Sequence, residues 1–441
     1  MTMAYEDYRD ANSRWVDRIP AHWRIERLKF VARPQASNVD KHSKDDEIPV
    51  RLCNYTDVYN NAQIIADMDF MEATATQAEI DKFALTDDEV IITKDSESWQ
   101  DIAVPAHVPN AIEGVLCGYH LTQIRPDQEQ LDGRYLYYQL CSAALNRQFQ
   151  VKANGVTRFG LPAYHIDNAE TVIPPIDEQR KIARFLDHKL GQIQALIEKK
   201  TKLLEQMEEQ RSSVITRAVT EGVDHPDAYR ETGFAWLPKV PASWSFKRLR
   251  FLLREPLMYG ANEAAEFEEP DWPRFIRITD VHANGTLRPE TFKSLPPEVA
   301  APYKLVAGDI LLARSGATVG KSFKYDDSWG AAAFAGYLIR ARFEPEFADF
   351  LTWYLRSQPY WEWVKGNFIQ ATIQNISAEK YSNLWVPVPP KAEREHIVAH
   401  IETEMEQIER VRQSIDKAIV CLAEYKASII TAAVTGQIKV V

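Results

Sequence analysis

Three stretches of the chain carry basic, amide and hydroxyl side chains but no acidic residue: 133–166, 311–325 and 364–378. Arg and Lys contact phosphates and guanine, Asn and Gln pair with adenine, and Ser and Thr bind either. We therefore expect these stretches to contact nucleic acid, although polar surface loops remain the alternative. The candidate residues are Arg147, Lys152, Asn154, Thr157 and Arg158, then Arg314, Ser315, Thr318 and Lys321, then Lys365, Asn367, Gln370, Thr372 and Gln374.

Two other motifs come close to a catalytic or metal site. The segment RSGATVGKS at 314–322 resembles a phosphate-binding P-loop, but Ser315 stands where the first Gly is required. The residues after Ser322 are typical of strand and turn, so no helix N-terminus is expected to hold phosphate. His396 and His400 are four residues apart, yet no third metal ligand is evident. We expect a chain with no catalytic residues and no metal; an ATPase that uses Lys321 is an alternative that a nucleotide-binding assay on Lys321→Ala would test.

These stretches belong to a duplicated sequence. WVDRIPAHWRIERLKFVAR from Trp15 matches WLPKVPASWSFKRLRFLLR from Trp236, 221 positions later. IPPIDEQRKIARFL from Ile173 matches VPPKAEREHIVAHI from Val388, 215 positions later, and the following residues keep that spacing to the end of each copy. The second copy is thus about six residues shorter, and the difference lies between the two matching segments. Thr157 and Thr372 hold the same position in the two copies.

Each copy ends in a segment with the pattern of a long helix. From about 178 to 220 there is no Pro and a single Gly, Gly191, with Pro174-Pro175 before the segment and Gly222 after it. About 43 residues at 1.5 Å each predict a rod of roughly 65 Å. Apolar residues recur every three or four positions, so we expect the two helices to pair as an antiparallel coiled coil. The helix-pairing residues are Leu186, Leu190, Ile193, Ile197, Leu204 and Met207 in the first helix, and Ile401, Met405, Ile408, Ile419, Leu422 and Ile429 in the second.

The part of each copy before its helix is predicted to be a mixed α/β domain, which makes the fold class α+β. Expected strands are 89–93, 112–124, 275–278, 309–314 and 336–343, and aromatic-rich helices are expected at 134–148 and 346–366. The predicted division is an N-terminal segment 1–14, domain one 15–175, helix one 176–222, linker 223–235, domain two 236–390, helix two 391–435 and a tail 436–441.

Composition limits the setting and raises one objection. Hydrophobic residues make up 45% and charged residues 26%, as in globular proteins, and no apolar run is long enough to span a bilayer. The N-terminus lacks the features of a signal peptide, and the four cysteines share no short spacing, so we expect a cytoplasmic protein. The net charge of −11 opposes phosphate binding, which therefore requires the basic groups to be concentrated locally.

The chain resembles the specificity subunit of Type I restriction-modification systems over nearly its whole length. The residues that carry the resemblance are IPAHW and VPASW followed by Arg-Leu, GDILLARSGATVGK at 308–321, the Pro-Pro pairs before each helix, and ITAAVTGQI at the C-terminus. The resemblance implies two target-recognition domains separated by two antiparallel helices. Each domain would read one half of a bipartite, asymmetric site in double-stranded DNA.

The resemblance also implies partners and site residues. Such a subunit is itself non-catalytic and docks two methyltransferase (modification) subunits, and the full phage-defence complex adds restriction-translocase subunits. S-adenosylmethionine, ATP and Mg belong to those partners. By position, Arg314 and Ser315 lie near DNA in the second domain, and Lys94 and Ser96 take their places in the first. Asp95 and Glu97 are acidic there, and carboxylates can also read cytosine. A structural hub that binds proteins but does not read DNA is the alternative.

Overall fold

The computed structural model describes all residues except 1–3, 225, 283–284, 368–374 and 441. The chain forms two compact units, each containing one globular domain and parts of both long helices. Unit 1 comprises Met1–Lys200 and Asp416–Val441, and unit 2 comprises Thr201–Ile415. Unit 1 is therefore assembled from two segments that are far apart in the sequence.

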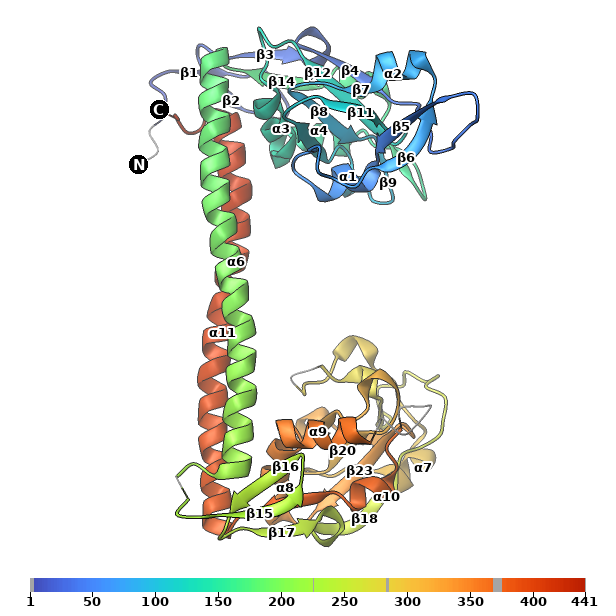
Figure 1. The fold of residues 1–441 in the computed structure, drawn as a ribbon, viewed down its shortest axis with the longest axis vertical. Coiled ribbons are helices and arrows are strands. Elements are labelled where there is room, and N and C mark those ends of the chain that lie inside the picture. Colours follow the sequence, from blue (N-terminus) through green and yellow to red (C-terminus); the bar gives the residue numbers. More distant parts are fainter. Residues whose placement is uncertain (1–3, 225, 283–284, 368–374, 441) are drawn as a thin grey trace. The chain divides into compact units, whose positions relative to one another are not determined.

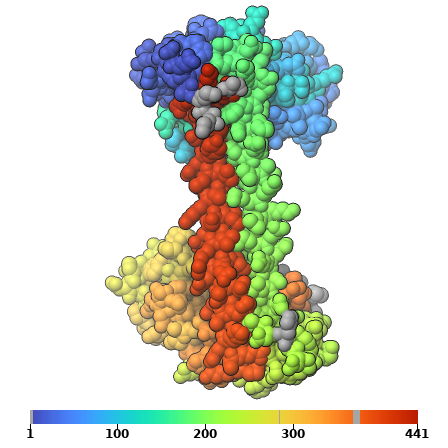
Figure 2. Space-filling model, turned by 90° about the vertical axis from the view of Figure 1, so that its left-hand side faces the viewer, coloured from blue at the N-terminus to red at the C-terminus, as the bar shows by residue number. Residues whose placement is uncertain are grey.

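The two predicted long helices are α6 (Ile176–Glu221) and α11 (Lys391–Val434). Within unit 1 the first part of α6 lies beside the last part of α11 and runs in the opposite direction (Figures 1 and 2). Ile182 and Leu186 of α6 share one buried core with Ile429 and Val434 of α11. In unit 2 the other ends of the two helices share a second core. No helix of the described chain is long and apolar enough to cross a membrane.

The twelve predicted helix-pairing residues all avoid full exposure. Six are buried: Leu186, Ile193, Met207, Ile401, Ile408 and Ile429. The other six are half-buried: Leu190, Ile197, Leu204, Met405, Ile419 and Leu422. Their apolar stripe thus lies on the inner face of each helix, as the spacing requires.

The domain of unit 1 contains two four-stranded sheets. The first has the order β10-β8-β12-β4 and is antiparallel, with β4 (Ala32–Ala36), β8 (Glu89–Thr93), β10 (Pro105–Val108) and β12 (Leu121–Pro126). The second has the order β6-β5-β11-β7, with β5 (Ile48–Cys53), β6 (Met71–Ala75), β7 (Ala84–Leu85) and β11 (Ile112–Cys117), and β5 and β11 are parallel. Helices α1 (Tyr55–Asn60), α2 (Gln77–Phe83) and α5 (Ala163–Asp167) lie in the connections.

Unit 2 repeats this arrangement with fewer strands. Its main sheet has the equivalent order β21-β20-β23-β18, with β18 (Leu253–Tyr259), β20 (Ile310–Ala313), β21 (Ser322–Lys324) and β23 (Leu338–Phe343). The parallel pair is β19 (Arg274–Ile276) and β22 (Ala332–Phe334). In the described residues this pair has no equivalents of β6 and β7. The helices of the connections include α7 (Pro297–Ala300) and α10 (Ala378–Ser382).

The opening and closing segments of the domain pair in the same way in both units. Strand β3 (Arg24–Arg27) pairs with β14 (Glu170–Ile173), and β17 (Ser245–Arg248) pairs with β24 (Trp385–Val388). A hairpin precedes each pair: β1 (Tyr8–Asp10) with β2 (Arg18–Pro20), and β15 (Tyr229–Phe234) with β16 (Leu237–Pro241). The two matching sequence segments of each copy are thus adjacent in space.

Three predicted elements were too long. The strand predicted at 112–124 is two strands, β11 and β12, because the chain turns at Gly118 and the strands join different sheets. The helix predicted at 134–148 is α3 (Gly133–Cys141) and α4 (Ala143–Gln150), which meet at the buried Ser142. The helix predicted at 346–366 is α8 (Pro345–Tyr354) and α9 (Gln358–Gly366), since Pro359 in the first turn of α9 cannot continue a helix from before it.

A buried tryptophan in each unit holds the start of one long helix and the end of the other. Trp23 Nε1 donates to Glu178 Oε2 in the first turn of α6 at 3.1 Å, and Trp244 Nε1 donates to Glu393 Oε1 in the first turn of α11 at 2.9 Å. The Trp23 ring also packs on Gly436, which ends α11. Carboxylates at helix N-termini are favourable because the helix dipole is positive there.

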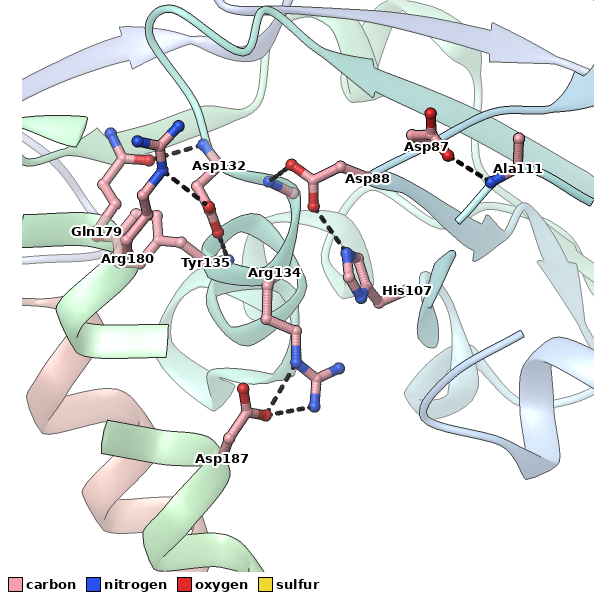
Figure 3. Close-up of polar contacts among 11 residues, drawn as sticks. Asp87, Asp88, His107, Ala111, Asp132, Arg134, Tyr135, Gln179, Arg180 and Asp187 are labelled. Atoms are coloured by element: carbon pink, nitrogen blue, oxygen red, sulfur yellow. Dashed lines mark hydrogen bonds and ion pairs between the residues drawn. The ribbon is translucent and has the colours of Figure 1, made fainter. Parts of the chain in front are cut away.

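A polar network fixes α3 and the neighbouring loops against α6 in unit 1 (Figure 3). Asp132 caps α3 by accepting from Tyr135 N at 2.9 Å, and its own N–H donates to Gln179 Oε1 of α6 at 2.9 Å. One turn into α3, Arg134 donates through Nε to Asp187 Oδ1 at 3.0 Å. These contacts couple the domain to the first turns of α6 and so limit how the helix can tilt.

Candidate nucleic-acid interface

Two cations occupy the same structural position in the two domains. Lys94 follows the last residue of β8, and Arg314 follows the last residue of β20. Lys94 N donates to His120 O and Arg314 N donates to Tyr337 O, both at 3.0 Å. The carbonyls of Lys94 and Arg314 accept from Leu161 N and Ile376 N, respectively, both at 2.8 Å. The equivalence of these two positions, which the sequence suggested, is therefore present in the backbone.

The Lys94 side chain turns partly inward. Its ammonium lies 4.4 Å from the centre of the Tyr119 ring and donates to Ser37 O at 2.9 Å. Burial of the ammonium lowers the pKa of Lys94. The Tyr119 ring is 50% exposed, so this cation and ring together form part of the surface at the end of β8.

Arg314 has a similar neighbour from a different strand. Its guanidinium carbon lies 4.6 Å from the centre of the Tyr259 ring, at the end of β18. The hydroxyl of Tyr259 accepts from Ala378 N at 2.9 Å, which fixes the ring. Arg314 Nε is buried and has no hydrogen-bond partner in the described part of the chain. A planar guanidinium held over an exposed tyrosine can present its outer nitrogens to a phosphate or a base edge.

Next to Lys94, three charged or ionisable side chains form a cluster. His120 Nδ1 lies 2.9 Å from Asp95 Oδ2, and Arg158 Nε donates to Asp95 Oδ1 at 3.0 Å. Short strands β9 (Asp95–Ser96) and β13 (Phe159–Gly160) pair and bring Asp95 to Arg158. Asp95 thus neutralises part of the positive charge of Arg158, whose side chain is still 54% exposed.

Ser96 lies differently from what its predicted role suggests. It is only 6% exposed, and its Oγ accepts from the Tyr55 hydroxyl and from Ser98 N, both at 3.3 Å. The side chain is used inside the domain because β9 turns it away from the surface. Its role in DNA binding stays a prediction that would require this loop to rearrange.

The loop after α4 presents the remaining predicted residues of the first domain. Arg147, Lys152, Asn154 and Thr157 are all exposed. The loop closes by paired backbone bonds, Asn154 N to Gly160 O at 3.1 Å and Gly160 N to Asn154 O at 2.8 Å. It is therefore a structured projection next to the cluster around Asp95, with polar side chains available on its surface.

The predicted residues of the second domain are only partly described. Ser315 and Thr318 are half-buried and Lys321 is exposed, all around the short helix at Gly316–Thr318. Lys365 is exposed and pairs with Glu362 at 2.9 Å, and the half-buried Asn367 donates its side-chain amide to Trp363 O at 2.8 Å. The residues Gln370, Thr372 and Gln374 lie outside the described residues.

Buried acidic residues stabilise the sheet behind each cation. Glu89 in β8 lies 3.2 Å from Arg125 Nε, and the equivalent Asp309 before β20 lies 2.7 Å from Arg342 Nε. Burial raises the pKa of Glu89, and hydrogen bonds to Asp309 raise the pKa of Arg342. Pairing a buried carboxylate with Arg satisfies it at fixed geometry, so the loops above stand on a rigid strand.

Sequence reasoning missed the tyrosines of this surface. Tyr119, Tyr259 and Tyr337 are 50%, 40% and 68% exposed, and each lies next to one of the strand-end cations or its backbone partner. Their sequence signal is weak, since aromatic residues in strands usually belong to the core. Exposed tyrosines beside cations are common on surfaces that bind nucleic acid or protein.

The geometry agrees with the rejection of the P-loop and metal motifs. Residues Ser322–Lys324 form strand β21, so Lys321 does not begin a helix. In the part of the chain that the structure describes, no group of three or more His, Cys, Asp and Glu side chains could hold a metal ion.

Comparisons with known proteins agree on one family. Residues 52–206 match the family model described as Type I restriction modification DNA specificity domain. The chain is 21% identical to the Type I restriction enzyme EcoBI specificity subunit of Escherichia coli, covering 74% of this chain and 70% of that protein. It is 23% identical to the MjaVIII specificity subunit of Methanocaldococcus jannaschii, covering 72% and 74%.

Two solved structures have the same fold. A chain from work on complex assembly and conformational transition of the type I R-M system superposes with a TM-score of 0.72 at 17% identity, covering 95% of this chain and 99% of that one. The HsdS subunit of Thermoanaerobacter tengcongensis gives a TM-score of 0.56 at 17% identity, covering 95% and 98%. The α+β architecture with two domains and two long helices is thus that of known structures.

Proposed function

Because this chain belongs with the specificity subunits of Type I restriction-modification enzymes, we propose that it reads DNA for such a complex. Each globular domain recognises one half of a bipartite, asymmetric site in double-stranded DNA. The paired helices set the length of the unread spacer between the halves. Two tethered readers raise the effective concentration of the second contact, so two modest half-sites make a tight whole.

One observation carries this proposal: the strand-end cation beside a tyrosine occurs in both domains, within loops that otherwise differ. Lys94 lies in an acidic and basic cluster with Asp95 and Arg158, whereas Arg314 lies beside Ser315 and has no nearby carboxylate partner among the described ion pairs. The same scaffold position with different neighbours is what two different half-sites require.

The proposal extends to the rest of the complex. The chain is the non-catalytic, cytoplasmic subunit that docks two methyltransferase subunits, and restriction-translocase subunits join the full assembly. S-adenosylmethionine, ATP and Mg are bound by these partners. The partners also share the phosphate contacts, which explains how a chain with a net charge of −11 takes part in DNA binding. The isolated chain should therefore bind DNA weakly, and tight, salt-resistant binding by it alone would contradict this point.

The test is to map methylated sites in cells that carry the complex with Arg314→Ala or Lys94→Ala. Each variant should relax sequence preference in one half of the site and leave the other half unchanged. Loss of a good base contact costs about 1–3 kcal/mol, or roughly 5- to 150-fold in discrimination. Arg314→Lys keeps the charge but not the two-pronged geometry, so it should restore affinity more than selectivity.

The matched controls are exposed lysines outside the candidate interface, Lys82→Ala in the first domain and Lys304→Ala in the second. Both should leave the methylated motif unchanged. If the cation variants also leave both halves of the motif unchanged while the complex still assembles, the chain is a structural hub and does not read DNA through this surface.

A further inference from the structure

Two exposed phenylalanines occupy the same position in the two copies of the repeat. Phe30 ends the short helix η1 (Leu28–Phe30) and is 62% exposed, and Phe251 ends η3 (Leu249–Phe251) and is 65% exposed. The leucines that begin these helices are 1% and 0% exposed, so the core is already filled by them. The two rings therefore contribute little to folding, and an exposed large apolar side chain at one place in both copies indicates binding.

Cations surround each ring in the same way. Lys29 Nζ lies 5.3 Å from the centre of the Phe30 ring, and the guanidinium carbon of Arg250 lies 4.9 Å from that of Phe251. The side-chain oxygen of Asn168 accepts from Lys29 Nζ at 2.9 Å and from Arg27 Nη1 at 3.2 Å.

The second copy keeps this arrangement. The side-chain oxygen of Asn383, which lies 215 positions after Asn168, accepts from Arg248 Nη1 at 3.2 Å and from Arg250 Nη1 at 3.3 Å. We call the two sets the Phe30 patch (Arg27, Lys29, Phe30, Arg33 and Asn168) and the Phe251 patch (Arg248, Arg250, Phe251, Arg254 and Asn383). In each patch an amide from the closing segment of the domain fixes two cations of the opening segment around an exposed ring.

The patches border equivalent grooves. The first groove is lined by Lys29, Phe30, Arg33 and Asp167, and the second by Arg250, Arg254 and Ser382. None of the six cations of the two patches forms an ion pair with a carboxylate within 4.0 Å in the described residues. Unpaired positive charge at two places on a chain of net charge −11 requires an acidic binding partner.

The exposed ring identifies the kind of partner. DNA phosphates would use the cations but gain nothing from an apolar ring, whereas protein interfaces are enriched in aromatic and Arg side chains at their centres. The occurrence of the patch once in each copy calls for a partner that is present twice. We propose that the Phe30 and Phe251 patches each dock one copy of the same protein, through an apolar pocket bordered by carboxylates. This inference rests on the proposed function, in which that protein is the modification subunit.

The experiment measures how many modification subunits the full chain binds, by native mass spectrometry and titration. Phe30→Ala and Phe251→Ala should each weaken one of two sites by about 30-fold, the equivalent of a 2 kcal/mol hot spot, and the double variant should weaken both. The charge reversals Lys29→Glu and Arg250→Glu should act in the same direction. Because these side chains are exposed, the melting temperature of the chain should not change.

Matched controls are Met71→Ala in unit 1 and Phe267→Ala in unit 2, which are both 42% exposed and lie outside the patches. They should bind two modification subunits with unchanged affinity. If the wild-type chain binds two and both phenylalanine variants do so equally well, the inference is wrong but the proposed function stands. If the variants instead reduce the salt dependence of DNA affinity, the patches contact phosphates and the inference is wrong. A wild-type chain that binds no modification subunit overturns both.

Discussion

Gly436 ends α11 against the opening segment of unit 1, and its replacement by Ala gives a quantitative test of that contact. The backbone of Gly436 has a φ of +73°, and Gln437 N donates back to Ala432 O at 2.8 Å, as at many helix C-termini. A Cβ at this position would lie 2.3 Å from Pro20 Cδ and 3.1 Å from the Trp23 ring. Both the conformation and the space therefore require glycine.

The expected cost has two parts. A non-glycine residue in the left-handed region costs about 1–2 kcal/mol, and overpacking against the rigid Pro20 ring costs about 1–3 kcal/mol more. Gly436→Ala should thus destabilise the end of α11 by about 2–5 kcal/mol. Gly114 has a similar φ of +72° but nothing within 4 Å of its Cβ, so Gly114→Ala should show only the first part. Gly191 lies exposed in α6 with open space around it, and Gly191→Ala should stabilise by up to about 1 kcal/mol.

Hydrogen exchange of the full chain measures these changes segment by segment, which avoids treating two units as one unfolding transition. Amides of 429–434 should exchange at least roughly 30-fold faster in Gly436→Ala, since 1.4 kcal/mol is a factor of ten. In Gly114→Ala the increase should be confined to β11 and be smaller. If the losses in the two variants are equal, the contact with Pro20 does not constrain α11, and the reasoning from the close approach is wrong.

Three further predictions concern single side chains. Trp244→Phe should cost about 1–3 kcal/mol in unit 2, because Glu393 loses its buried donor, and thermal unfolding should show no change in unit 1. The Arg412 guanidinium lowers the pKa of Glu409 to about 2, so this pair stabilises unit 2 above the ordinary carboxyl value of 4.5 and is lost as pH falls from there to about 2; Glu409→Gln should remove that part of the acid sensitivity of the melting temperature. Cys421 is the exposed cysteine, and burial raises the pKa of the other three thiols, so a thiol reagent at pH 8 should label one site rapidly and none in Cys421→Ser.

The duplication and the long helices could be predicted from the sequence because they depend on local, periodic patterns. The expected helix at 178–220 is α6 at Ile176–Glu221, and the expected strand at 89–93 is β8. Breaks within elements were harder. The turn at Gly118 was missed because β11 and β12 are both apolar, and which sheet each strand joins depends on distant partners such as β5.

The candidate site was predictable by residue type but not by direction of the side chains. Arg158 and Thr157 lie on an exposed loop as expected, whereas Ser96 is turned inward by the pairing of β9 with β13. The tyrosines beside Lys94 and Arg314 come from other strands, so no spacing in the sequence connects ring and cation. Contacts of this kind depend on the tertiary fold, which local patterns do not encode.

The composition of unit 1 from two distant segments has a consequence for folding during synthesis. The first domain leaves the ribosome early, but the α11 residues that cover Tyr135 and Trp23 are made only after the whole of unit 2. Unit 2 can therefore complete its core first, while the apolar surface of the first domain waits for its final segment. A chain that stops shortly before Ile429 would contain every residue of both domains and still be unable to finish the first one.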